Sequence, residues 1–132
     1  TILDLAGIAA PATVQGASFA PLLQGQSPTD WRRATYYAYY EDSWRLHGRG
    51  DEAMAEPYRY FTPHRIGPHR GVRTDRYKLI EYYGEGDYWE FFDLREDPDE
   101  LHNRYDDPQF AKRVAELKEE LYGLRRHYGD LP

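Results

Sequence analysis

The stretch from His69 to Asn103 constrains the fold most, because three short strand-like runs follow one another in it with very short connections. Each run is rich in β-branched or aromatic residues and is bounded by turn residues. The connections are two and four residues long, whereas a parallel crossover needs about a dozen residues or more. The stretch is therefore predicted to be an antiparallel β-meander, with strands at residues 69–74, 77–83 and 88–94.

Residues 34–40, with the sequence ATYYAYY, are predicted to add a fourth strand to this sheet. Successive side chains of a strand point to opposite faces of the sheet. This alternation places Tyr36 and Tyr40 on one face and Tyr37 and Tyr39 on the other.

Residues 108–128 carry a helical pattern. Asp107 suits an N-cap before Pro108, and Gly129 suits the position just after the helix. The apolar stripe recurs at spacings of 4, 3, 4 and 3 residues, at Phe110, Val114, Leu117, Leu121 and Leu124. We therefore predict an α+β fold, in which a four-stranded antiparallel sheet is packed on one face by a C-terminal helix.

The composition narrows the classes of partner. The chain has 132 residues, the size of one domain, and its net charge of −6 argues against nucleic acid as the main partner. It contains no Cys, so neither a disulfide nor a thiolate metal site can form. No apolar run approaches the roughly 20 residues of a membrane span, and no leader pattern opens the chain. These observations leave both the cytoplasm and the periplasm open as compartments.

The first 33 residues are predicted to form a linker with short helices. Residues 1–8 resemble the second half of an amphipathic helix that ends at Gly7, and a second short helix is expected between Ser18 and Gly25. Because the sequence starts inside an element, we expect a fragment in which this linker joins an N-terminal catalytic domain to a subdomain at residues 34–132. A complete small domain with a frayed N-terminus is the alternative.

Candidate binding residues gather around the first strand of the meander. Two imidazoles and three guanidiniums lie there, at His64, Arg65, His69, Arg70 and Arg73. These groups suit recognition of a carboxylate, a phosphate or a sulfate. They accompany residues 41–68, a long, aromatic-rich loop that we expect to face substrate or a partner. The alternative is that Arg70 and Arg73 pair with carboxylates such as Asp75 or Asp93.

No complete catalytic constellation is visible in the sequence. The three serines, Ser18, Ser27 and Ser43, lie in no nucleophile-elbow context. The acidic turn at residues 93–103 lacks the spacing and the central glycine of an EF-hand calcium loop. We interpret it as a structural turn, in which Asp and Asn side chains accept hydrogen bonds from nearby backbone amides. We therefore assign no catalytic, cofactor-binding or metal-binding residue to this chain.

An ordered set of motifs resembles the C-terminal subdomain of the type I sulfatases, which belong to the alkaline-phosphatase-like superfamily. The matching positions are GVRT at 71–74, KLI at 78–80, WEFFDL at 89–94, Asp97-Pro98, Glu100 and Asn103. The terminal helix follows these motifs as it does in the family. The opening segment, with Gln15-Gly16 and the LLQG stretch at 22–25, resembles the family's connection between domains. The resemblance covers essentially the whole chain.

The resemblance implies that the parent protein is a sulfuric ester hydrolase. The family's catalytic formylglycine, made from Cys or Ser in a C/S-x-P-x-R motif, and its calcium ion belong to the N-terminal domain. This chain contains no such motif, so we expect it to be inactive alone. The resemblance also implies that the subdomain closes one side of the active-site cleft. His69, Arg70 and His64 are then the candidate contacts to a sulfated small molecule or glycan.

Two further interpretations stay open. The chain could be a non-enzymatic binding or structural module for an acidic sugar or a protein partner. It could also be the same region of a related phosphodiesterase or phosphonate hydrolase. Whether the parent enzyme is a sulfatase or a related hydrolase, a fragment of it is expected to expose a flank that the catalytic domain covers, and therefore to self-associate.

Overall fold

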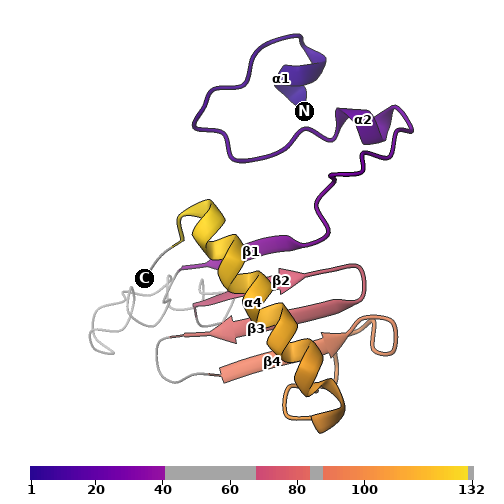
Figure 1. The fold of residues 1–132 in the computed structure, drawn as a ribbon, viewed down its shortest axis with the longest axis vertical. Helices are drawn as coiled ribbons and strands as arrows, with labels where there is room; N and C mark the ends of the chain where they lie inside the picture. Colours follow the sequence, from indigo (N-terminus) through magenta and orange to yellow (C-terminus); the bar gives the residue numbers. More distant parts are fainter. Residues whose placement is uncertain (41–67, 84–87, 131–132) are drawn as a thin grey trace, which may run out of the picture. The chain divides into compact units, whose positions relative to one another are not determined.

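A computed structural model of the chain describes residues 1–40, 68–83 and 88–130. The chain divides into two units, residues 1–33 and 34–132, and we call the second unit the subdomain. The subdomain is built from four strands, one short 3-10 helix and one long α-helix (Figure 1). These elements are β1 (Thr35–Tyr39), β2 (His69–Arg73), β3 (Tyr77–Tyr82), β4 (Tyr88–Asp93), η2 (Pro108–Phe110) and α4 (Ala111–Tyr128).

The four strands form one antiparallel sheet in the order β1-β2-β3-β4. The tight turn between β2 and β3 is closed by Thr74, whose backbone N–H donates to Tyr77 O at 2.8 Å. The Thr74 hydroxyl also accepts from Tyr77 N at 2.9 Å. The predicted fold class is confirmed, and the strand bounds agree with the prediction to within one residue. The predicted loop at 84–87, and residues 41–67 of the predicted loop at 41–68, lie outside the described residues.

The helix α4 crosses one face of the sheet diagonally (Figure 1). Val114, Leu117 and Leu121 of α4 are buried as the predicted stripe requires. They pack in one cluster with side chains from the middle of the sheet, Val72, Leu79, Trp89 and Phe91. Burying a large apolar side chain stabilises a fold by about 1.5–3 kcal/mol, so this layer accounts for much of the stability of the subdomain.

The two ends of the terminal helix are fixed by the residues that the sequence indicates. Asp107 accepts from Gln109 N at 3.0 Å, and Pro108 begins a turn of 3-10 helix before α4 proper. Gly129 ends α4 with a φ of 70°, which glycine adopts without steric cost. Just beyond it, Asp130 accepts a hydrogen bond from the Tyr36 hydroxyl, which ties the helix end to β1.

The N-terminal unit contains two short helices, α1 (Ile2–Leu5) and α2 (Ala20–Leu23). Ser18 connects them, because its hydroxyl donates to Asp4 Oδ2 at 2.7 Å and accepts from Ala20 N at 3.2 Å. Both helices end near a glycine with positive φ, Gly7 and Gly25, as predicted. Many large apolar side chains of this unit are exposed: Ile2, Leu5, Ile8, Val14, Phe19, Leu22 and Leu23.

Candidate functional site

The sheet separates the candidate binding residues. His69 and Arg70 are consecutive in β2, so their side chains project from opposite faces. His64 lies outside the described residues. The structure therefore does not gather His69 and Arg70 on one surface, and the role of all three residues in substrate binding stays a prediction.

Arg70 lies on the face that α4 covers, and its guanidinium is engaged within the fold. Its Nε donates to Glu81 Oε2 at 2.5 Å, and both side chains are largely buried. The guanidinium carbon also lies 4.6 Å from the centre of the Tyr83 ring. Burial alone would lower the pKa of Arg70, but the hydrogen bond to Glu81 and the charge of that carboxylate outweigh burial and raise it. The alternative interpretation, pairing with a carboxylate, holds for Arg70.

Arg73 has the same orientation as His69 in β2, and its side chain is exposed. Over the described ranges no carboxylate forms an ion pair with it. Its charge acts on the buried Tyr37 hydroxyl, where it partly opposes the effect of burial, which raises the pKa of that tyrosine. Arg73 therefore adds positive charge to the face of the sheet opposite α4.

His69 belongs to a row of four rings on the face opposite α4. The row follows the register of the sheet, because Tyr39 pairs with His69, His69 with Tyr82, and Tyr82 with Tyr88. The centres of successive rings are 5.6, 5.3 and 5.5 Å apart. We call Tyr39, His69, Tyr82 and Tyr88 the aromatic row. The first three are partly buried, and Tyr88 is 54% exposed.

Glu90 supplies the polar end of the aromatic row. The hydroxyls of Tyr82 and Tyr88 donate to its two carboxylate oxygens at 3.2 and 3.3 Å. Asn103 donates in turn to the Tyr88 hydroxyl at 3.4 Å. Burial, followed by the charge of Glu90, raises the pKa of Tyr82 to about 12, so this hydroxyl keeps its proton at neutral pH. The row thus combines ring faces with hydroxyl donors and a carboxylate acceptor.

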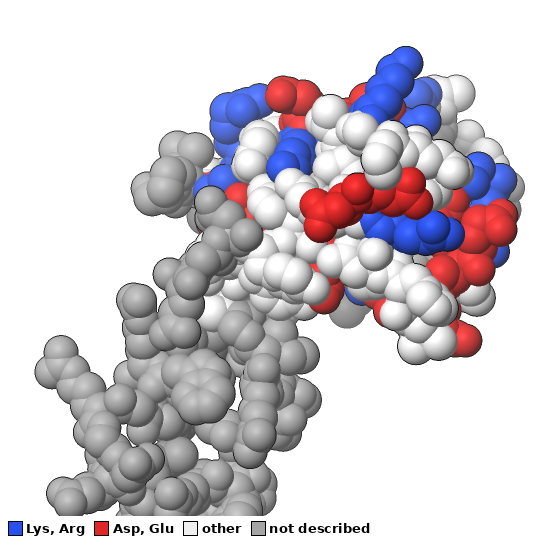
Figure 2. All heavy atoms as spheres, turned by 90° about the horizontal axis from the view of Figure 1, so that it is seen from below, with Lys and Arg blue, Asp and Glu red and all other residues white. Residues whose placement is uncertain are grey.

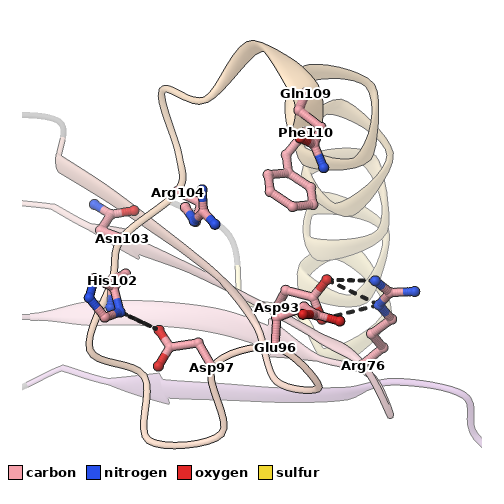
Figure 3. A pocket seen from close by; sticks show the side chains of 9 residues that line it. All are labelled: Arg76, Asp93, Glu96, Asp97, His102, Asn103, Arg104, Gln109 and Phe110. Carbon is pink, nitrogen blue, oxygen red and sulfur yellow. Dashed lines mark hydrogen bonds and ion pairs between the residues drawn. The ribbon is translucent and has the colours of Figure 1, made fainter.

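A hollow of about 740 Å³ lies at the acidic turn after β4 (Figure 3). Its walls come from the β2–β3 turn, the acidic turn and the start of the terminal helix. The lining residues are Arg76, Asp93, Glu96, Asp97, His102, Asn103, Arg104, Gln109 and Phe110. As Figure 3 shows, Arg76 points at the buried Asp93, to which it donates three hydrogen bonds of 2.7–3.1 Å. These bonds hold the pKa of Asp93 below its ordinary value, against the effect of burial.

Other polar side chains that line the hollow stabilise the acidic turn through hydrogen bonds. Asp97 accepts from the backbone N–H groups of Leu101 and His102 at 3.1 and 2.8 Å, and these bonds lower its pKa. Asn103 accepts from Phe91 N at 3.0 Å and donates to Trp89 O at 2.9 Å. This confirms the interpretation of residues 93–103 as a structural turn. In the part of the chain that the structure describes, no three His, Asp or Glu side chains converge as metal ligands.

The surface around this end of the subdomain carries both signs of charge. Figure 2 shows Lys and Arg side chains interspersed with Asp and Glu, with apolar and neutral atoms between them. The view therefore contains no continuous basic surface of the kind that follows a nucleic-acid backbone. Among the described residues, no helix is both long and apolar enough to cross a membrane.

Sequence reasoning missed Arg76, Tyr82, Tyr88 and Glu90. The signal for the three β3–β4 residues was present, because a meander with known turns fixes which residues lie opposite each other. Once the register is drawn, one aromatic residue from each strand falls into a single line. The partner of Arg76 had no such signal, because it lies 17 positions away across a turn.

Comparison with known proteins places the chain among the sulfatases. The chain matches the family described as N-sulphoglucosamine sulphohydrolase, C-terminal, over residues 1–49 and 46–127. It is 36% identical over 98% of its length to an N-acetylglucosamine-6-O-sulfatase of Bacteroides thetaiotaomicron. It is 35% identical over 88% of its length to a delta 4,5-hexuronate-2-O-sulfatase of the same organism. The chain spans about 20% of the length of each of these relatives.

Solved structures agree with the sequence matches. One, of a protein in complex with its substrate D-glucosamine-2-N,6-O-disulfate, superposes on 98% of the chain with a TM-score of 0.78 and 36% identity; the chain covers 23% of it. A phosphonate monoester hydrolase from Silicibacter pomeroyi superposes on 97% of the chain, which covers 24% of that protein, with a TM-score of 0.70. Its identity of 24% shows a shared fold alone. By its motifs, its fold and these matches, the chain belongs to the sulfatase family and corresponds to its C-terminal region.

Proposed function

We propose that this chain is the C-terminal part of an enzyme that hydrolyses a sulfate ester on a sugar. In this proposal it completes the substrate cleft and supplies none of the reacting groups. The observation that carries the proposal is the 36% identity, over 98% of the chain, to a sulfatase named for 6-O-sulfated N-acetylglucosamine. A sulfated amino sugar is accordingly the substrate class that we propose first.

The proposal is supported by the contacts that several charged side chains of this chain already make within the fold. Arg70 is paired with Glu81 and Arg76 with Asp93, while Asp97 holds backbone amides. None of these groups is placed to attack sulfur or to hold a metal ion. The sequence also lacks a C/S-x-P-x-R motif. We propose that the formylglycine and the calcium ion of the parent enzyme are held by an N-terminal domain.

The recognition role falls first to His69. It stands in the aromatic row, on the face away from α4, and an imidazole can hydrogen-bond a sulfate or a sugar hydroxyl near neutral pH. His64 is proposed as a second contact. Arg70 can contribute only through N–H groups other than the Nε that Glu81 occupies.

The N-terminal catalytic domain is the proposed partner of the smaller unit. Residues 1–33 expose seven large apolar side chains, of which Ile2 is 84% and Leu23 64% exposed. This many exposed large apolar side chains in 33 residues support an interaction with a partner. Because the relatives are about five times longer than this chain, we propose that the partner is another domain of the same polypeptide.

The test compares the full-length polypeptide with the 132-residue chain, using N-acetylglucosamine 6-sulfate and a phosphonate monoester as substrates. We expect the full-length protein to release sulfate and the chain alone to release none. The control is the full-length protein with the Cys or Ser of its C/S-x-P-x-R motif changed to Ala, which should be inactive. Sulfate release by the chain alone would contradict the proposal that the reacting groups lie in the N-terminal domain.

Preferred cleavage of the phosphonate by the full-length protein would support the alternative of a phosphonate hydrolase. A parent polypeptide without the C/S-x-P-x-R motif that still bound the sulfated sugar would instead support a non-enzymatic binding module.

A further inference from the structure

We propose that the β3–β4 end of the aromatic row, formed by Tyr82, Tyr88 and Glu90, binds the neutral sugar next to the sulfated one. This inference rests on the proposed function and extends it from one sugar unit to a chain. We call these three residues the neighbour subsite.

Two rows of side chains cross this sheet on opposite faces, and they differ in burial. Val72, Leu79 and Phe91 form the row under α4 and are fully buried. In the aromatic row, Tyr88 is 54% exposed, although it occupies the corresponding place in β4. The exposed ring of Tyr88 can therefore contact a ligand.

The tyrosine rings and their hydroxyl groups together suit contact with a sugar. An aromatic face accepts the apolar C–H face of a sugar ring, while a phenol hydroxyl can exchange hydrogen bonds with sugar hydroxyls. Ring centres 5.5 Å apart make Tyr82 and Tyr88 one continuous surface. Their hydroxyls meet Glu90 at 3.2 and 3.3 Å, long hydrogen bonds that a sugar hydroxyl could replace.

The charge of Glu90 predicts selectivity between neutral and sulfated sugars. A carboxylate accepts hydrogen bonds from sugar hydroxyls but repels a second sulfate. The guanidinium of Arg73 lies instead in β2, on the same face of the sheet as His69. The charge of this face therefore changes from positive at β2 to negative at β4. The neighbour subsite is thus suited to an unsulfated sugar, and the sulfated sugar to the side of His69.

The experiment uses the full-length enzyme and two substrates with the same sulfated unit. One is N-acetylglucosamine 6-sulfate, and the other is a tetrasaccharide in which neutral sugars follow that unit. We expect Tyr88→Ala to raise KM for the tetrasaccharide about 10-fold, the worth of one good ring contact, without changing kcat. The monosaccharide should be hydrolysed as by the wild type.

Two further variants distinguish the contribution of the Tyr88 ring from that of the Glu90 carboxylate. Tyr88→Phe keeps the ring and should retain most of the tetrasaccharide affinity. Glu90→Gln keeps the size of the side chain and should lower KM for a tetrasaccharide with a second sulfate on the neighbouring sugar. The control is Leu101→Ala, because Leu101 is 73% exposed in the acidic turn, outside the neighbour subsite. It should leave both substrates unaffected.

Equal losses for both substrates with Tyr88→Ala, or no loss for the tetrasaccharide, would overturn the inference. Failure of the proposed function is a different result, in which the wild-type enzyme releases no sulfate from either substrate. In that case calorimetry with the unsulfated tetrasaccharide decides, since binding that depends on Tyr88 supports the subsite and its absence refutes it.

Discussion

Gly71 is the residue on which the packing of the sheet depends most directly. It lies in β2 between Tyr37 of β1 and Ile80 of β3, and the Tyr37 ring covers it. A methyl group at this position would lie 2.7 Å from the carbonyl oxygen of Leu79 and would overlap the Tyr37 hydroxyl. The backbone of β3 cannot yield without loss of strand pairing.

Gly71→Ala is therefore expected to destabilise the fold by about 1–3 kcal/mol, the usual cost of overpacking a core. Urea unfolding would show it as a lower midpoint at an unchanged slope. Gly123→Ala is the matched control, because Gly123 lies inside α4 with no atom within 4 Å of the added methyl group. There alanine should stabilise by about 0.5–1 kcal/mol. A neutral Gly71→Ala would show that β1 is not held against β2 as described.

Asp93 makes the stability of the subdomain depend on pH. Hydrogen bonds from Arg76 lower its pKa in the folded state. A carboxyl group with a lowered folded pKa stabilises the fold fully above its unfolded pKa of about 3.9, and this contribution is lost as the pH falls through the folded value. Asp93→Asn should therefore be less stable than the wild type at pH 7, and the difference should shrink below about pH 4.

Unfolding free energies of wild type and Asp93→Asn measured between pH 2 and pH 7, a range of about 5 units centred near the carboxyl titration, would check this. Asp99→Asn, an exposed position in the same turn, is the control and should follow the wild type throughout. A difference between wild type and Asp93→Asn that stays constant across the range would contradict the assignment.

At the scale of elements, the acidic turn completes the sheet along the outer edge of β4. Exposed strand edges can pair with other chains. Here Asn103 takes the place of a neighbouring strand, since it accepts from Phe91 N and donates to Trp89 O. The next residue, Arg104, donates its backbone N–H to Phe91 O at 2.9 Å. The hydrogen bonds that a neighbouring strand would make are thus supplied by one amide side chain and one backbone group.

Replacing Asn103 tests this function of the turn. Asn103→Ala leaves Phe91 N and Trp89 O without partners and should cost about 1–3 kcal/mol of unfolding free energy. Hydrogen exchange should locate the loss, with faster exchange of the Phe91 amide. Asn103→Asp keeps the acceptor, so the Phe91 amide should stay protected although the bond to Trp89 O is lost. Unchanged exchange at Phe91 in Asn103→Ala would refute this role.

The elements were predictable where their causes are local. The apolar stripe of α4, the Asp107 cap and the Gly129 end all lie within a few residues of the structure that they determine. The face of the sheet on which each β2 side chain lies was also predictable, because alternation along the strand alone places His69 and Arg70 on opposite faces. Contacts such as Arg76–Asp93 and Tyr36–Asp130 were not predictable, because they depend on how the turn and the helix end return to the sheet.

At the scale of the whole molecule, the two units differ in how well they bury their apolar side chains. The subdomain has a closed core between α4 and the sheet. In residues 1–33, the buried apolar class contains Ala20 alone, and seven larger apolar side chains are exposed. The same segment carries only four charged side chains, Asp4, Asp30, Arg32 and Arg33. We therefore expect residues 1–33 to bind an apolar surface of a partner.

The isolated chain of 132 residues should accordingly self-associate as its concentration rises, and light scattering would show a mass that increases with concentration.

Changing Ile2, Leu5 and Leu23 together to Ser should restore the monomer, because these three are between 59% and 84% exposed. Leu101→Ser is the control, since Leu101 is similarly exposed at 73% but lies in the subdomain. It should leave the association unchanged. In the full-length protein the same triple change should lower stability, because we propose that these side chains contact the catalytic domain there. A clean monomer of the isolated chain at every concentration would mean that residues 1–33 need no partner, and the proposed contact with the N-terminal domain would lose its main support.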